Sequence, residues 1–357
     1  MAKTIVNNNI KLKSGGGLKN DATDGLSVDT TALIFGNGSD GDVTISSNTS
    51  LNRDMFYNNL TINSGVILNP NGYRIFVMKT LTNNGTIARN GNDGGNGGNS
   101  SAGVAGAGGT GGAALAAGTI YGGLAGGAGG AGIIGSGDGN AGEDGTSLNP
   151  SITGVNGVNG GKGGKGHSAG AERFGGTGGT ATLEATYFNF GNKKTTALDS
   201  ETSVNFLPYV LNGVTSLDTL SSSASSGGGA SGSVYYTAQA NNISGGGGGA
   251  GGNGGIVYIS AKTIVNNGTI SATGGKGGNA GTYYQADNGG IGGSGGGAGG
   301  QGGLIIMIYS SYPTVGTINV AGGVGGTKSN SNGKGMSTDG ADGANGNNGK
   351  YIKVLVS

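Results

Sequence analysis

Residues that commonly carry out chemistry are scarce and scattered in this 357-residue chain. Cysteine is absent, which excludes disulfides, thiolate metal ligands and cysteine nucleophiles. His167 is the one histidine and stands in a glycine-rich stretch, so a histidine metal cluster is excluded and a Ser/His/Asp triad is disfavoured. We interpret His167 as a loop residue that is either solvated or part of a binding surface.

Acidic residues occur in short clusters that could suggest calcium sites or an acid–base pair. Asp40 with Asp42, Asp138 between two glycines, and Asp339 with Asp342 are the nearest approaches to glycine/aspartate calcium repeats. None repeats every nine residues, so we expect ordinary turns and no metal site. No carboxylate pair stands out as a general acid and base, because closeness along a chain does not place two groups across a substrate. The sequence therefore predicts no enzyme activity, with a glycan depolymerase kept as the third alternative.

Glycine-rich loops can also cradle phosphate, but the motifs that would show it are uninformative here. With so much glycine, the pattern G-x-G-x-x-G arises about five times by chance. The P-loop pattern fails, because no lysine that follows a glycine has both the required upstream glycine and a following Ser or Thr. We predict no cofactor.

Charge and hydropathy disfavour two further classes of partner. The chain has 19 Lys plus Arg against 18 Asp plus Glu, with no long run of like charge, so electrostatic capture of nucleic acid or anionic lipid is not expected. Residues 1–11 lack the apolar core of a signal peptide, and no run of about 20 apolar residues could span a membrane. We expect no nucleic-acid binding, no membrane insertion and no export by a signal peptide.

The glycines themselves predict the scaffold. The chain has 89 of them, and they recur with period three, two to a triplet, as in GGNGG at 94–98, GGKGGKG at 160–166 and GGTGG at 175–179. Three residues per turn is the repeat of a polyproline-II-type helix, which has no internal hydrogen bonds. Two glycines per turn leave two faces bare, so that neighbouring helices can exchange backbone hydrogen bonds. We predict an ordered bundle of polyglycine-II helices, with the third residue of most triplets facing solvent.

Strand-like segments separate the glycine tracts. Residues 73–87, 255–270 and 303–318 share one order: a long strand, an Asn-Asn-Gly or equivalent turn, and a short strand followed by a glycine tract. Short β-branched runs upstream, at 43–45 and 60–62 for example, suit the rungs of a β-solenoid or a small sheet with apolar residues stacked inward.

We therefore predict a mostly β and irregular fold without significant α-helix, in which a strand-rich base carries the polyglycine-II bundle. The predicted division is an N-terminal attachment segment at 1–45, a strand-rich base at 46–92, a bundle at 93–349 interleaved with strands at 183–224, 256–270 and 304–318, and a C-terminal strand at 350–357.

Loops that interrupt the glycine tracts are the predicted binding residues. Loops on a rigid scaffold are common recognition sites, and Tyr combined with Ser, Gly and Asn binds adaptably at low entropic cost. Simple helix-to-helix turns would explain the same interruptions without any binding. The candidate receptor-binding residues are Tyr121, Leu148, Asn149, His167, Phe174, Tyr235, Tyr236, Tyr283, Tyr284, Gln285, Lys328 and Asn330.

Two features resemble bacteriophage fibre proteins. Residues 10–28 (IKLKSGGGLKNDATDGLSV) are similar to connector segments of tail-fibre and related virion proteins, and the interrupted GGxGG tracts of 90–349 resemble the glycine-rich adhesins at the tips of T-even-like long tail fibres. In that family a polyglycine-II sandwich presents variable loops to a receptor on the bacterial surface. The resemblance implies a virion protein, assembled in the host cytoplasm, that binds a bacterial surface protein or glycan and attaches to other virion proteins through its N-terminal segment.

This chain departs from a bare glycine sandwich, because it also has a strand-rich segment of about 90 residues at its start and strands between the glycine tracts. A tail-fibre tip, a baseplate protein and a head-surface or decoration protein therefore stay open, and a homotrimer suits a fibre although no heptad repeat marks it. The alternative function is a non-adhesive virion protein or an ice-binding-like structural protein. Ice binding needs a flat face of regularly repeated small residues, whereas Asn96, Lys162 and Ile291 differ in size and charge.

Overall fold

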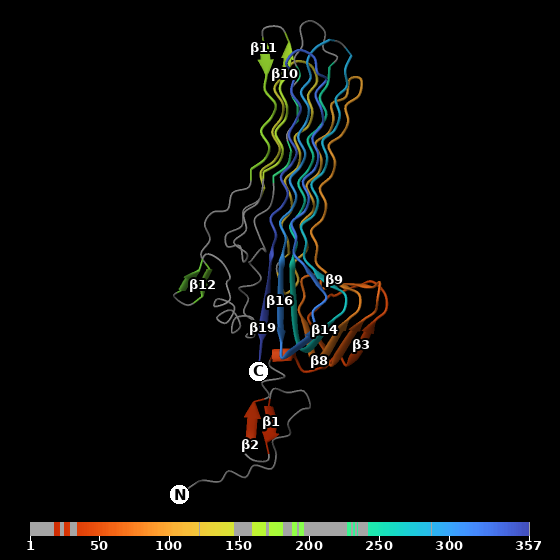
Figure 1. Cartoon of the computed structure of the whole chain (residues 1–357), viewed down its shortest axis with the longest axis vertical. Helices are drawn as coiled ribbons and strands as arrows, with labels where there is room; N and C mark the ends of the chain where they lie inside the picture. Colours follow the sequence, from red (N-terminus) through yellow and green to blue (C-terminus); the bar gives the residue numbers. More distant parts are fainter. Residues whose placement is uncertain are drawn as a thin grey trace.

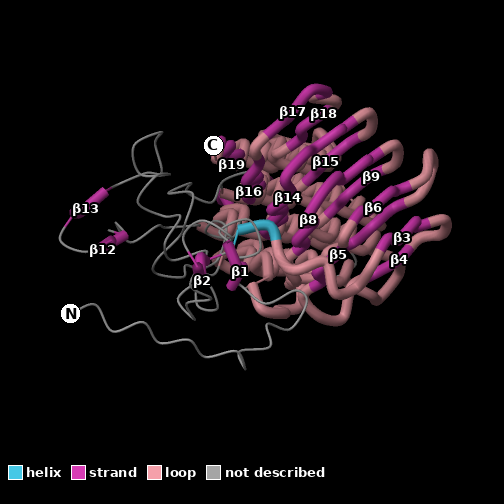
Figure 2. The backbone as a smooth tube through the Cα atoms, turned by 90° about the horizontal axis from the view of Figure 1, so that it is seen from below, coloured by secondary structure: helices cyan, strands magenta, loops and turns pink. Residues whose placement is uncertain are grey.

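The computed structural model describes residues 34–120, 122–145, 159–168, 171–180, 227–229, 231–232, 234, 242–286 and 288–356, together with strands at 18–21, 25–28, 188–190 and 193–195. Within these residues the regular structure is β-strand, apart from a helical turn at 34–35 (Figure 2). The predicted mostly β fold without significant α-helix is confirmed.

The base is a stack of parallel strands in two sheets (Figures 1 and 2). The first sheet contains β3 (Asp42–Ile45), β5 (Met55–Tyr57), β6 (Asn59–Ile62), β8 (Ile75–Asn83), β14 (Ile256–Asn266), β16 (Leu304–Tyr309), β17 (Ser311–Thr314) and β19 (Lys350–Leu355). The second contains β4 (Thr49–Ser50), β7 (Ile67–Asn69), β9 (Thr86–Ala88), β15 (Thr269–Ser271) and β18 (Thr317–Asn319). Their orders are β19-β16-β14-β8-β6-β3 and β18-β15-β9-β7-β4.

The repeated segments found in the sequence are successive rungs of this stack. Asn266 of β14 lies beside Asn83 of β8, and Thr269 of β15 lies between Thr86 of β9 and Thr317 of β18. The turns also stack, because the Asn83 amide donates to Asn266 Oδ1 at 2.8 Å. Each rung buries its apolar side chains only against its neighbours, as in a β-solenoid.

Two apolar clusters lie on the two faces of the first sheet. Residues at alternate positions, such as Ile305 and Met307 of β16, join the cluster that also contains Ile87 and Ile270 of the second sheet. The positions between them, such as Ile306 and Ile308, join a cluster with Phe35 and Ile120 on the other face. Burial on both faces explains why β16 and the first half of β14 are continuous apolar runs and show no alternation of apolar and polar residues.

Extended glycine-rich runs continue the strands away from the base (Figure 1). In run 89–100, Gly91, Gly94 and Gly97 donate backbone hydrogen bonds to run 272–283, whereas Gly95 and Gly98 donate to run 104–116. Residues three apart therefore bond to the same neighbour, and adjacent residues bond to different ones. This is the hydrogen-bonding pattern of the predicted polyglycine-II bundle.

Most glycines in the runs are required because the backbones of neighbouring runs approach too closely to leave room for a Cβ atom. A Cβ added to Gly248 would lie 1.9 Å from the carbonyl oxygen of Gly278, which no neighbouring backbone could accommodate. Positive φ angles occur instead in the turns, as at Gly103 (76°) and Gly333 (65°), where a residue without Cβ is favoured.

Three runs lie inside the bundle: the described residues of 227–234, residues 242–255 and residues 289–303. Run 242–255 is hydrogen-bonded on all sides, to runs 89–100, 104–116, 122–132, 227–234, 272–283 and 289–303. The expectation that third residues face solvent holds for outer runs, where Asn96 and Lys162 are exposed, but is wrong for inner ones, where Asn253, Ser294 and Gln301 are buried. A surrounded helix has neighbours on all three faces, so its third residue is either small or hydrogen-bonded, as when Asn253 Oδ1 accepts from the Gln301 N–H at 3.0 Å.

The structure also divides the chain differently from the predicted segments. β3 falls in the predicted attachment segment 1–45, yet it pairs with β6 in the main sheet. β14, β16 and β19 come from the predicted bundle and C-terminal strand and complete that same sheet. Three hairpins stand apart from the two sheets: β1 (Leu18–Asp21) with β2 (Gly25–Val28), β10 (Gly166–Ser168) with β11 (Ala171–Arg173), and β12 (Phe188–Phe190) with β13 (Lys193–Thr195). The remainder of the predicted strand region 183–224 lies outside the described residues.

Candidate receptor-binding surface

The turns between glycine runs at the end far from the sheets form one surface, which we call the tip (Figure 1). Its described residues are 101–104, 133–137, 165–168, 171–174, 283–286, 288–291 and 329–338. Backbone hydrogen bonds hold several of these turns to the inner runs. Tyr284 and Ile243 bond reciprocally at 2.8 and 2.9 Å, the Gly137 N–H donates to the Val234 carbonyl at 2.9 Å, and the Asn332 N–H donates to the Ile291 carbonyl at 3.1 Å.

A small apolar cap closes the inner runs at the tip. Val234, Ile243 and Ile291 occur where the three inner runs end or begin, and each is at most 1% exposed. Isolated antiparallel bridges join Val234 to Ile291 and Ile243 to both Ile134 and Tyr284. The tip turns therefore rest on a packed and hydrogen-bonded platform.

Four turns of the tip present large apolar side chains to solvent. Val104 is 58% exposed, Ile134 53%, Phe174 56% and Met336 67%. Covering these side chains would remove apolar surface from water, which makes the tip a candidate contact surface. Single exposed apolar residues also occur elsewhere, as at Val324 (60%) and Leu355 (69%). Only Phe174 was among the predicted residues. Val104, Ile134 and Met336 were missed, although each is a large apolar residue that interrupts a glycine tract.

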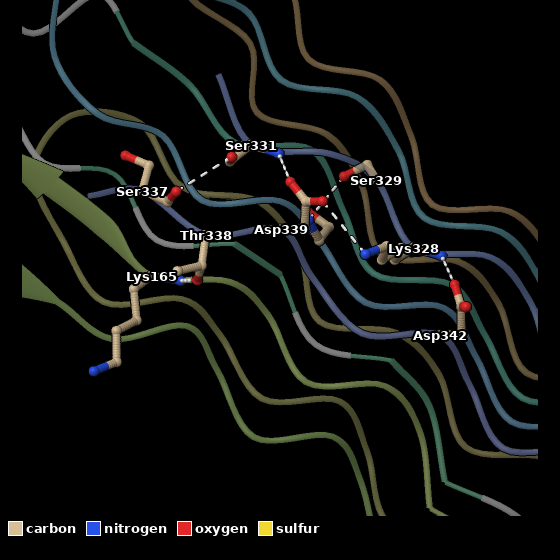
Figure 3. Close-up of polar contacts among 9 residues, drawn as sticks. Lys165, Lys328, Ser329, Ser331, Ser337, Thr338, Asp339 and Asp342 are labelled. Carbon is tan, nitrogen blue, oxygen red and sulfur yellow. Dashed lines mark hydrogen bonds and ion pairs between the residues drawn. The ribbon is translucent and has the colours of Figure 1, made fainter. Parts of the chain in front are cut away.

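Charged groups flank the turn at 331–337 (Figure 3). Lys328 Nζ lies 3.3 Å from the Asp339 carboxylate, whose Oδ1 accepts from the Ser331 N–H at 2.8 Å. On the neighbouring hairpin, Lys165 Nζ lies 3.4 Å from Glu172 and 5.2 Å from the centroid of the Phe174 ring. The Lys165 N–H donates to Thr338 Oγ1 at 2.8 Å, which joins the two turns.

The structure brings seven of the twelve predicted site residues to this end. Phe174, Gln285, Lys328 and Asn330 are exposed there, and Tyr283 and Tyr284 are half-buried. His167 lies on β10 of the tip hairpin, but its side chain lies outside the description. Tyr121, Leu148, Asn149, Tyr235 and Tyr236 lie outside the described residues.

The interruption that ends at Tyr121 belongs to the base, which corrects its assignment to the binding loops. Ile120 is 1% exposed in the apolar cluster on the outer face of the first sheet, and its N–H donates to the Gly72 carbonyl at 2.8 Å. Thr119 Oγ1 donates to Asp54 in the same region. Run 104–116 leads back from the tip, so the turn after it meets the sheets.

Asn and Asp in the outer runs form hydrogen-bonded ladders. In the first, the Oδ1 atoms of Asn90, Asp93, Asn96 and Asn99 accept from the N–H groups of Thr273, Lys276, Asn279 and Thr282 at 2.7–2.9 Å. In the second, those of Asp339, Asp342, Asn345 and Asn348 accept from Ser331, Lys328, Gly325 and Gly322 at 2.8–3.1 Å. Asp339 and Asp342 therefore lie on an extended run and not in the expected turn. Their role here is to satisfy N–H groups at the bundle surface.

Replacing Asn96 by alanine is expected to lower the free energy of unfolding by about 0.5–1 kcal/mol, because the Asn279 N–H loses its acceptor but can still meet water. Urea denaturation would measure the change. Lys162→Ala is the matched control, since Lys162 is also an exposed third residue but its side chain has no acceptor atom. Equal losses for the two variants would contradict the ladder's role.

Acid is expected to weaken the hydrogen bond from the Ser331 N–H to the Asp339 carboxylate, which is the bond of the second ladder nearest the tip. The Ser331 N–H and, to a smaller extent, Lys328 hold the pKa of Asp339 below its ordinary value of 3.8. Because the pKa is lower in the folded state, this contribution to stability is present above the unfolded pKa and is lost as the pH falls through the folded pKa. We expect the NMR signal of the Ser331 amide to titrate with a midpoint below 3.8. Asp339→Asn should abolish that titration, whereas a midpoint at or above 3.8 in the parent would contradict it.

The described residues contain no cluster of three or more His, Cys, Asp or Glu side chains able to hold a metal ion. Nor does that part of the chain contain a helix long and apolar enough to cross a membrane. Comparison with protein-family models, with curated proteins and with solved structures gives no match to this chain.

Proposed function

We propose that the protein is a bacteriophage virion adhesin that binds a receptor on the bacterial surface with its tip. The observation that carries this proposal is the placement of Val104, Ile134, Phe174 and Met336, four exposed apolar side chains on separate turns at one end of the molecule. The resemblance of the interrupted glycine tracts to tail-fibre adhesins suggests the class of partner. No catalysis is part of the proposal.

The rigidity of the platform supports a binding role. Side chains held on ordered turns lose little conformational entropy when a partner covers them, which favours affinity. The turns bond to inner runs through their backbones, as Tyr284 does to Ile243. Substitution of side chains on the turns would therefore leave these backbone hydrogen bonds in place. This suits a surface whose side chains must match a receptor.

The sides of the bundle give less support to the ice-binding alternative. Neighbouring outer runs present Asn96, Lys276 and Val324 to solvent, which differ in charge and size. The Asn96 Oδ1 atom already accepts a hydrogen bond from the next run. Such a face offers no uniform array of small residues.

Binding of fluorescently labelled protein to a panel of bacterial strains would test the proposal. An adhesin should bind at least one strain saturably, and unlabelled protein should compete. A folded protein, shown by a cooperative thermal transition, that binds no strain across a broad panel would overturn the receptor-binding role. The weight would then move to a structural component of the virion.

A further inference from the structure

The last rung of the base is incomplete among the described residues. β19 extends the first sheet beside β16, but no described strand lies on the same side of β17 or of β18. Ile87 and Ile270 of the second sheet are fully buried, whereas Ile318 in the next rung is only half-buried. Tyr351 and Leu355 are 52% and 69% exposed, although they stand in register with Ile305 and Tyr309.

The rung of β14 shows what the missing part would be. Ile256–Ser260 in that rung pair with Leu304–Ile308, which is the stretch of β16 that β19 covers on its other side. The next residues of β14 lie beside β17, with Thr263 beside Ser311 and Val265 beside Thr314. Leu355 and Val356 already take the places that Ala261 and Lys262 have in the β14 rung, because Leu355 pairs with Tyr309 and the Val356 N–H donates to the Tyr309 carbonyl. The open position next to β17 therefore corresponds to residues 263–267 of the β14 rung.

The sequence contains a second copy of that segment. Residues 2–8 read Ala-Lys-Thr-Ile-Val-Asn-Asn, which is identical to residues 261–267. In the β14 rung, the copies of Ala2, Ile5 and Asn7 are buried, and the copy of Lys3 is exposed. The heptapeptide is thus a rung sequence whose pattern of buried and exposed side chains the fold already accommodates once.

We propose that residues 4–8, the last five of the heptapeptide, complete the open rung by adding as a parallel strand beside β17, with Val6 next to Thr314. The strand would extend the first sheet past β17, and it would follow Val356 along the same edge. It comes from the same chain.

The chain enters the base at β14, one strand away from β16 and β17. The carbonyl of Ile34 accepts from Ser260 Oγ at 2.6 Å, and Phe35 packs in the cluster that contains Ile352 of β19. Residues 9–17, between the heptapeptide and β1, can span up to about 30 Å when extended. This length favours a strand supplied by the same chain.

Cysteine pairs test the proposal cleanly, because the chain has no cysteine of its own. Val6→Cys with Thr314→Cys should form a disulfide under mild oxidation, since neighbouring parallel strands bring Cα atoms within disulfide range. On a non-reducing gel, a compact monomer would show the proposed addition within one chain, whereas a covalent oligomer would show addition between copies and would overturn it. The control pair is Val6→Cys with Ser50→Cys, on β4 at the opposite edge of the second sheet. Equal yields for the two pairs, or no Val6–Thr314 product from folded protein, would overturn the proposal.

A second pair of variants separates specific docking from chance contact. In the Val6→Cys, Thr314→Cys background, Ile5→Asp should lower the cross-linking yield by about tenfold or more, because it places a carboxylate at a buried position. Lys3→Asp should leave the yield unchanged. Deletion of residues 1–8 should also raise amide hydrogen exchange at 311–319. If Pro313 and Lys353 instead protect a bare edge, the deletion will change nothing and the proposal fails.

Discussion

Replacing Gly248 by alanine is expected to lower the free energy of unfolding by about 3 kcal/mol or more. Gly248 lies in an inner run, and an added Cβ would meet the Gly278 carbonyl oxygen at 1.9 Å and the Gly297 nitrogen at 2.7 Å. Relief of these clashes requires two neighbouring runs to separate, which lengthens hydrogen bonds on both sides. One methyl group therefore acts on several backbone contacts at once.

Urea denaturation of Gly248→Ala and Gly137→Ala would measure this effect against a matched control. A Cβ on Gly137 would meet only Ile133 Cδ1, at 3.4 Å. Alanine there should change stability by about 1 kcal/mol or less, in the stabilising direction, because it restricts the unfolded chain. Similar denaturation midpoints for the two variants would show that the inner glycines are not needed for close approach.

Replacing Phe174 and Met336 together by serine is expected to weaken receptor binding by about 30-fold or more, which is the loss of one strong hot spot. Both side chains are more than half exposed. The backbone of Phe174 bonds to Asp138 and Gly139 of the neighbouring run, and the turn of Met336 is held by the bond from the Asn332 N–H to the Ile291 carbonyl. Serine removes the apolar surface and disturbs little of the fold. The thermal transition of the double variant should therefore match that of the parent.

Binding isotherms on a strain that binds the parent would give the ratio of affinities. Ile67→Ser with Val324→Ser is the control, because these residues are 44% and 60% exposed but lie on β7 and on the side of run 320–331. The control should keep the parental affinity. If it loses affinity as much as the tip variant does, then the receptor covers the flank of the molecule, and the tip is not the binding surface.

The sequence predicted the two building principles of the fold because both leave a periodic record. Two glycines in each triplet indicate helices that must approach closely on two faces, and the Asn-Asn-Gly turns at Asn83 and Asn266 mark equivalent positions of successive rungs. Which runs lie inside the bundle was not predicted. A signal was present in the five consecutive glycines at 245–249, since a helix with neighbours on all faces favours a small third residue wherever that residue does not, like Asn253, form a side-chain hydrogen bond.

The site was predicted less well, because its position depends on the path of the chain through the bundle. Ile120 and Ile134 both interrupt glycine tracts, yet one is buried at the base and the other is exposed at the tip. Only the alternation of outgoing and returning runs decides which turn reaches which end. The prediction favoured aromatic and polar loop residues and therefore omitted Val104 and Met336, whose side chains are exposed to at least the same fraction as that of Phe174.

The continuity of runs and strands has a mechanical consequence. Runs 242–255, 289–303 and 338–349 pass without a break into β14, β16 and β19, and each is bonded sideways to its neighbours along its length. A force that pulls a tip turn away from the base would act along the runs. The hydrogen bonds between neighbouring runs would then share the load in shear, so they would not break one after another. Extended chains have little slack to give up, because their rise per residue is already close to the maximum. Such a body would pass tension from anything bound at the tip to whatever holds the base, with little stretch.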